Sequence, residues 1–204
     1  MKKFDSHLLV EDLNKLPIKF RTVFAVLCVE RILPLLPNLS RVKSGDLSMW
    51  RDAVAELWAD VQKKKFTEEE LKARISTYTN RIPTEESGWT DGQAATEDCG
   101  AAIAYAYRSR LFGDSQEAAW SAQRAYELLD YLVTHSRESD QRNYGDEQAI
   151  ISDPLIQEEL GYQEESLRSL FNLVDNSDGV MQKMDSLRQK AIVAGERRRI
   201  RIVG

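Results

Sequence analysis

The apolar run VFAVLCVERILPLL, residues 23–36, predicts a long buried helix that begins after Pro17. Proline suits the first turn of a helix, because its missing N–H would have no partner there. Pro34 lacks the backbone donor that would reach the carbonyl of Glu30, so we expect a kink or an early end at this point. The charged pair Glu30-Arg31 is therefore expected inside the protein, where a charge is costly unless it is paired and hydrogen-bonded.

Helical periodicity on both sides of this run predicts an all-α protein. Besides the buried helix, the expected helices cover residues 7–16, 47–64, 67–81, 94–112, 115–136 and 153–174, and a last helix ends near Gly195. No segment shows the clean alternation of a β-strand. The chain is predicted to form a single domain, residues 1–204, built as a bundle of seven or eight helices. Residues 196–204 are predicted to form a basic C-terminal tail.

The composition excludes several classes of protein. Hydrophobic residues at 42% can fill a core, so disorder of the whole chain is not expected. The net charge of −5 argues against general binding to nucleic acids or membrane surfaces. The apolar run is too short and too charged to span a bilayer, and the first residues lack the apolar stretch of a signal peptide. We expect a cytoplasmic protein in which Cys28 and Cys99 are reduced, buried thiols.

Polar residues interrupt the apolar stripe of the helix over residues 153–174. Gln163 falls near the centre of this stripe, and Glu159 and Glu164 fall on its borders. We expect this helix to meet the buried one, and the polar residues to form a single buried network: Glu30, Arg31, Glu159, Gln163 and Glu164. Arg31 would grip Glu159 or Glu164 through two hydrogen bonds. Such a network either fixes the helix register or lines a polar pocket for a small ligand.

An acidic ridge extends from Gly145 to Glu165, a stretch without Lys or Arg. The acids that we predict to bind a partner are Asp146, Glu147, Glu158 and Glu165. A ridge of this kind can capture a basic protein, although acids also suit the solvated start of a helix. The basic run Arg197–Arg201 has four open uses: contact with RNA, with an anionic surface or with the acidic ridge, or solvation as a frayed tail.

Enzyme signatures are weak. His7 and His135 have no metal-binding constellation around them, so we predict no metal and no cofactor. Glu127-x-x-Asp130 resembles one half of the acid motif of all-α nucleotide pyrophosphohydrolases, but the companion Glu-x-x-Glu on a preceding helix is missing. No phosphate-binding glycine loop or nucleophile elbow occurs. The sequence leaves the question of an enzyme open, favours a non-enzymatic protein and names no catalytic residue.

Several segments resemble the YjaG-like family of small bacterial proteins of unknown function. The segments are Glu30-Arg31-Ile32-Leu33-Pro34, Trp58, Ser109–Asp114, Asp153–Glu159 with Gln163, Leu187-Arg188, and Ala194-Gly195-Glu196. The resemblance implies an all-α domain and carries over no catalytic residue. The cysteine before Glu30 and the extra arginines at the end depart from the family's pattern.

The function that the sequence favours is a non-enzymatic protein-interaction module with an acidic binding face. An immunity- or antitoxin-like role, in which the acidic domain masks a basic toxin, is one specific version. The alternative is a small-molecule-binding protein or enzyme with a buried polar pocket near Arg31, Glu159 and Gln163. The expected partner is a protein, with a basic one favoured and a homodimer left open; RNA binding through residues 197–201 is the least favoured use.

Overall fold

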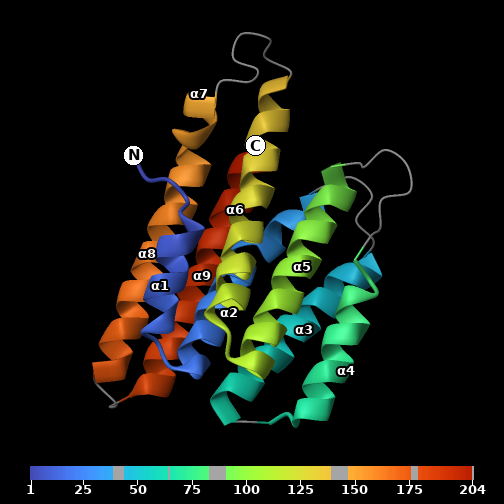
Figure 1. Cartoon of the computed structure of the whole chain (residues 1–204). Coiled ribbons are helices and arrows are strands. Elements are labelled where there is room, and N and C mark those ends of the chain that lie inside the picture. Colours follow the sequence, from blue (N-terminus) through green and yellow to red (C-terminus); the bar gives the residue numbers. More distant parts are fainter. Residues whose placement is uncertain (39–43, 64, 83–90, 139–146, 176–178, 204) are drawn as a thin grey trace.

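The computed structural model describes the chain apart from residues 39–43, 64, 83–90, 139–146, 176–178 and 204 (Figure 1). The described residues form nine α-helices and one 3-10 helix, and contain no strand, which confirms the all-α prediction. The elements are α1 (Ser6–Asn14), α2 (Ile18–Ile32), η1 (Leu33–Asn38), α3 (Ser44–Lys63), α4 (Glu68–Thr79), α5 (Asp91–Phe112), α6 (Ser115–Glu138), α7 (Glu147–Ile151), α8 (Pro154–Asp175) and α9 (Val180–Val203).

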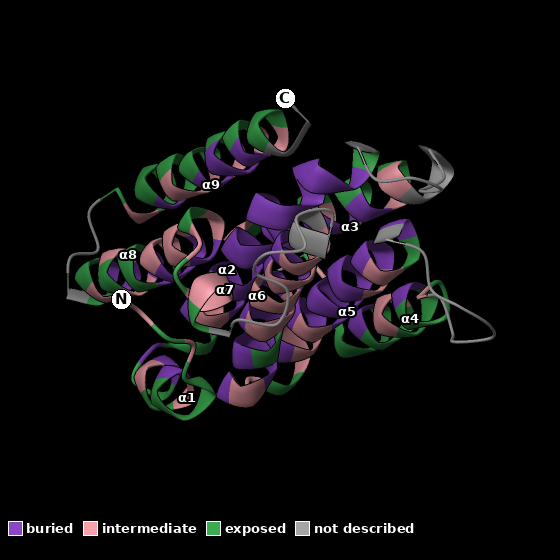
Figure 2. Cartoon of the chain, turned by 90° about the horizontal axis from the view of Figure 1, so that it is seen from above, coloured by how far each residue is buried: buried purple, intermediate pink, exposed green. Residues whose placement is uncertain are grey.

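Helix α2 lies in the middle of the bundle, as its apolar sequence predicts. It contacts α3, α5, α6, α8 and α9, and its residues from Val23 to Ile32 are all buried. Seen from above, the buried residues gather on α2 and on the neighbouring α3 and α5 (Figure 2). Full burial of a large apolar side chain contributes about 1.5–3 kcal/mol to stability, so this central helix contributes strongly to the core. No helix in the described part of the chain has the length and apolar character needed to cross a membrane.

Pro34 has the effect that the sequence predicts. Helix α2 ends at Ile32 and the chain continues as the 3-10 helix η1, which also contains Pro37. The backbone between Glu30 and Pro34 packs against α9, where Gly195 lies. The early end of α2 therefore sits beside the charged pair.

Two elements differ from the prediction. The short helix α7 follows a polar stretch that gave no helix signal, and it brings the helix count above eight. Helix α9 does not end near Gly195 but continues to Val203, so residues 196–203 are helical and not a frayed tail. A Cβ at Gly195 would lie 2.9 Å from the carbonyl oxygen of Arg31. Gly195 thus permits close contact between α9 and α2, and it does not terminate the helix.

Candidate functional site

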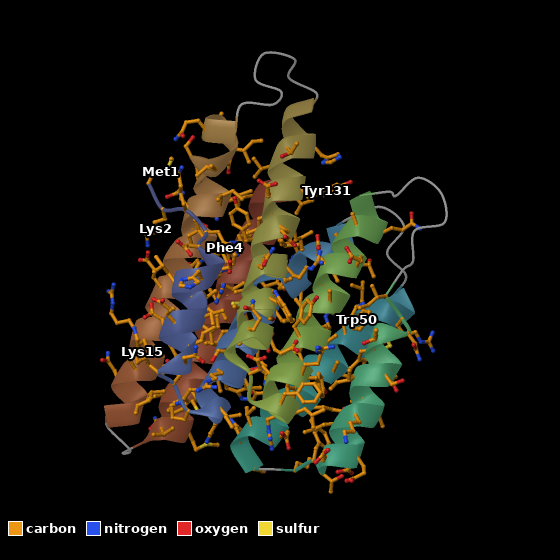
Figure 3. The ribbon with its side chains drawn as sticks, viewed as in Figure 1. Met1, Lys2, Phe4, Lys15, Trp50 and Tyr131 are labelled. Atoms are coloured by element: carbon orange, nitrogen blue, oxygen red, sulfur yellow. The ribbon has the colours of Figure 1, made fainter. Side chains whose placement is uncertain are left out.

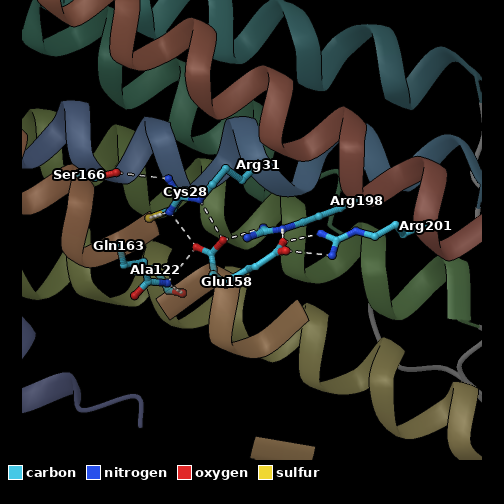
Figure 4. Close-up of polar contacts among 9 residues, drawn as sticks. Cys28, Arg31, Ala122, Glu158, Gln163, Ser166, Arg198 and Arg201 are labelled. Carbon is cyan, nitrogen blue, oxygen red and sulfur yellow. Dashed lines mark hydrogen bonds and ion pairs between the residues drawn. The ribbon is translucent and has the colours of Figure 1, made fainter. Parts of the chain in front are cut away.

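The strongest polar feature of the fold is a buried triad formed by Arg31, Glu159 and Arg198 (Figure 4). Glu159 lies on α8 with no exposed surface, between Arg31 of α2 and Arg198 of α9. Arg31 donates Nε to Oε2 at 2.9 Å and Nη2 to Oε1 at 2.7 Å. Arg198 donates Nη1 to Oε2 at 2.7 Å. The predicted two-bond grip of Arg31 on Glu159 is confirmed, and a second arginine completes it.

Gln163 and several neighbours add further contacts to the triad. Gln163 donates its amide N–H to Oε1 of Glu159 at 3.0 Å and to the carbonyl oxygen of Ala122 at 3.3 Å. Nη2 of Arg31 also donates to Sγ of Cys28 at 3.2 Å. The ring of Tyr162 lies 5.9 Å from the guanidinium carbon of Arg31 and 5.4 Å from that of Arg198. The predicted placement of Gln163 in the network is therefore confirmed.

The electrostatics of the triad favour an ionised Glu159. Burial raises the pKa of a carboxyl group, but the guanidiniums of Arg31 and Arg198 outweigh this effect and hold the pKa of Glu159 at about 2. Arg198 is fully buried, and its Nε and Nη2 have no hydrogen-bond partner among the described residues. The triad thus contains two buried cations and one buried anion, with no surface for a ligand at Glu159.

Two predicted members of the network lie elsewhere. Glu30 pairs with Arg188 of α9, with Oε1 2.6 Å from Nε. Successive helix residues point about 100° apart, so Glu30 and Arg31 face different neighbours. Glu164 is 55% exposed and pairs with Lys2 at 2.6 Å, on the N-terminal segment that passes beside α8 (Figure 3). The prediction of one network containing Glu30 and Glu164 is wrong.

Two of the four acids predicted to bind a partner, Glu158 and Glu165, form ion pairs within the chain. Both carboxylate oxygens of Glu158 accept hydrogen bonds from Arg201. Glu165 lies 3.6 Å from Nζ of Lys190. Asp146 lies outside the described residues, and Glu147 begins α7 with a side chain that the structure does not describe. Among the open uses of the basic run, contact with the acidic residues of α8 is the one that Arg198 and Arg201 make.

Arg198 is the member of the triad that the sequence pattern did not predict. The stripe of α9 that faces the bundle contains Met184, Ala191 and Ala194, all buried. Continued at helical spacing, the same stripe reaches Arg198. This helical spacing would have predicted that Arg198 is buried, but the predicted end of the helix at Gly195 left Arg198 outside it.

A groove runs along the outer side of α8 and α9. It consists of two adjoining hollows of about 390 and 370 Å³ that share Tyr162, Ala194 and Arg197. We call this the α8–α9 groove, and its remaining lining residues are Glu158, Glu165, Ser186, Gln189, Lys190, Val193, Ile200 and Arg201. Val193 and Ile200 are 40% and 66% exposed. Arg197 is exposed and forms no ion pair with any residue that the structure describes.

A second polar cluster joins α5 and α6. Nη1 of Arg124 lies 3.1 Å from Asp98, 3.2 Å from Glu127 and 3.9 Å from Glu97. Burial, reinforced by the charge of Glu97, raises the pKa of Asp98 to about 7. Glu127 is the first acid of the Glu127-x-x-Asp130 motif, and Arg124 connects it to Asp98 of α5. In the part of the chain that the structure describes, no three His, Cys, Asp or Glu residues have the arrangement of a metal site.

The two cysteines are free and buried, as the sequence predicts. Burial raises the pKa of Cys28 to about 12 and raises that of Cys99 as well. A thiolate nucleophile needs a lowered pKa and access to solvent, so neither cysteine fits that role.

Comparison with known proteins places the chain in a family. The model of a family described as "protein of unknown function (DUF416)" matches residues 9–196. The chain belongs to the DUF416 family. The crystal structure of a DUF416 family protein from Shewanella baltica OS155 is similar, with a TM-score of 0.69, 17% identity and 96% of each chain covered. This likeness supports the DUF416 fold and says nothing more specific. No curated protein matches the chain, and the name YjaG-like stays a prediction.

Proposed function

We propose that this DUF416 protein is a non-enzymatic interaction module that binds another protein through the α8–α9 groove. The observation that carries the proposal is the unpaired Arg197 between the exposed Val193 and Ile200. These three residues recur at i, i+4 and i+7 of α9, which is the spacing that meets the apolar face of an incoming helix. Scattered exposed apolar residues need no explanation, but an aligned set around a cation is typical of a docking face.

The charges of the groove favour an acidic helical segment as the occupant. Glu158 and Glu165 already contact Arg201 and Lys190, so Arg197 is the charge in the groove that has no ion-pair partner among the residues that the structure describes. A carboxylate on an amphipathic helix can take two hydrogen bonds from a guanidinium. We therefore propose an acidic partner segment in place of the basic protein that the sequence favoured. An immunity- or antitoxin-like role stays compatible with this proposal if the masked protein carries such a helix.

The buried triad supports the groove and is not itself proposed as a binding site. Arg31 and Glu159 are 1% and 0% exposed and bond to each other, and Glu159 also accepts a hydrogen bond from Arg198. The triad holds the end of α9 against α2 and α8, and Arg197 and Ile200 flank Arg198 in this helix. The alternative is a small-ligand pocket near Arg31, Glu159 and Gln163: Gln163 lines a hollow of about 220 Å³ beside the N-terminal segment, whereas Arg31 and Glu159 are buried and line none of the hollows described above.

Site-specific photo-crosslinking tests the proposal. A photoreactive residue at position 193 of the full chain should form a covalent adduct with one protein, through an acidic helical segment identified by mass spectrometry. The double variant Val193→Asp/Arg197→Glu should lose this partner in affinity purification, and moderate salt should weaken its binding. The matched control Leu8→Asp/Arg51→Glu carries the same changes at exposed positions of α1 and α3 and should retain the partner. An adduct through a basic segment, or equal loss in both variants, would contradict the proposal.

A further inference from the structure

A separate hollow of about 310 Å³ lies where the start of α2 meets the ends of α3 and α5. Its lining residues are Ile18, Lys19, Asp60, Val61 and Arg110. None of them lines the α8–α9 groove, and the hollow is more enclosed than the groove. Its volume falls at the lower end of the range of about 300–1,000 Å³ that is usual for small-molecule sites.

The guanidinium of Arg110 forms an ion pair with a buried carboxylate. Asp60 has no exposed surface, and its Oδ2 lies 2.6 Å from Nε of Arg110. The other oxygen, Oδ1, accepts the backbone N–H of Phe66 at 2.6 Å. Oδ2 forms no hydrogen bond with any residue that the structure describes, so its contact with Arg110 is an ion pair in which the arginine offsets the charge of Asp60.

The remaining donors of the hollow are cationic. Within the described residues, no hydrogen bond uses Nη1 or Nη2 of Arg110, whose side chain is 22% exposed. Lys19 forms no ion pair with a described residue, and its Nζ lies 3.8 Å from Sδ of Met181. Two cations therefore face the hollow against one carboxylate that is already bonded, which leaves a net positive charge.

The other side of the hollow is apolar. Ile18 is 49% exposed at its mouth, and Val61 lies at the wall. An exposed isoleucine beside two cations offers contact to an aliphatic group, while the guanidinium fork suits a carboxylate or a phosphate. We infer that this hollow binds a small oxyanion, a carboxylate or a phosphate, attached to an aliphatic chain.

Titration of the full chain with hexanoate and with hexyl phosphate, followed by methyl NMR, tests the inference and distinguishes the two headgroups. We expect saturable shifts at the methyl groups of Ile18 and Val61 with at least one of these probes. Hexylamine, which has the same chain and the opposite charge, should cause no saturable shift. Equal binding of hexylamine, or no saturation with either anion, would overturn the inference.

Substitutions of the two cations that line the hollow test where the anion binds. Arg110→Gln should weaken binding by about tenfold, the usual loss of a charge-assisted hydrogen bond. Because this variant leaves Asp60 buried without its partner and can fail to fold, Lys19→Gln provides a second test at the rim. It should weaken binding by about threefold, whereas Arg51→Gln on the exposed face of α3 should leave binding unchanged. Equal affinity of Lys19→Gln and the wild-type protein, with the shifts intact, would overturn the assignment of this hollow.

Discussion

At the scale of single residues, Glu159 is the carboxylate that pairs with two buried arginines, Arg31 and Arg198. Removal of its charge leaves Arg31 and Arg198 buried without a carboxylate between them. We expect Glu159→Gln to lower the free energy of unfolding by about 3–5 kcal/mol, the usual cost of breaking a buried pair by removing one partner. Urea unfolding followed by circular dichroism measures this loss.

The matched control is Glu164→Gln on the same helix. Glu164 is 55% exposed and pairs with Lys2, and surface pairs of this kind contribute at most about 1 kcal/mol. Equal losses for the two variants would contradict the structural role assigned to the triad.

Asp98 should make stability depend on pH near neutrality. Burial and Glu97 raise its pKa from 3.8 to about 7 in the folded protein. Between these two values the folded state binds more protons at Asp98 than the unfolded state, so the contribution of Asp98 to stability is fully present below about pH 4 and is lost as the pH rises to about 7. Asp98→Asn should flatten this decline and raise stability at pH 8 by about 1–3 kcal/mol. Urea unfolding midpoints measured from pH 5 to 8 give the change in stability with pH, and the exposed Asp52→Asn is the control. If stability fell with pH as steeply in Asp98→Asn as in the wild-type protein, the assignment to Asp98 would be wrong.

The residues of the site could be predicted in part. The apolar pattern around Arg31, Glu159 and Gln163 showed that these polar groups are buried, and their meeting followed from the chemistry of guanidinium and carboxylate. The pattern does not specify which neighbour each residue faces. Glu30 therefore joined the wrong network, since its partner Arg188 depends on the rotation of α9 against α2.

At the scale of elements, Gly195 and Gly161 allow the effect of close helix packing on stability to be separated from the effect of helix propensity. A Cβ at Gly195 would meet the carbonyl oxygens of Arg31 and Glu30 at 2.9 and 3.0 Å, so α9 would have to move away from α2. We expect Gly195→Ala to destabilise the protein by about 1–3 kcal/mol despite the better helix propensity of alanine.

Gly161 in α8 provides the contrast. A Cβ there would meet only Nζ of Lys2, at 3.5 Å, which is ordinary contact. Gly161→Ala should therefore stabilise the protein by about 0.5–1 kcal/mol. Thermal and urea unfolding of both variants tests the pair, and a stabilising Gly195→Ala would show that α9 does not approach α2 as closely as described.

Among the elements, the long helices were predictable because their periodicity and termination signals agree. The short helix α7 was not, since five residues carry too little periodicity to be recognised. The end of α9 was missed for a different reason. A glycine followed by arginines resembles a helix C-terminus, and only the packing against α2 shows that Gly195 serves close contact.

At the scale of the whole molecule, the buried triad joins three elements that are distant in sequence. Arg31, Glu159 and Arg198 connect α2, α8 and α9, and the groove proposed for a partner lies along two of these helices. The sequence could establish the bundle, because that follows from apolar patterning. It could not reveal the groove, because its shape depends on how α9 packs beside α8.

Hydrogen exchange across α9 tests this central claim most directly. We expect the backbone amides of residues 198–203 to be protected in the wild-type protein at neutral pH, and to exchange faster in Glu159→Gln than in the Glu164→Gln control. Protection that is lost with the charge of Glu159 would establish that the triad holds the end of α9 in the bundle. Unprotected amides over residues 198–203 in the wild-type protein would contradict the account, because the segment would then be the solvated tail that the sequence predicted.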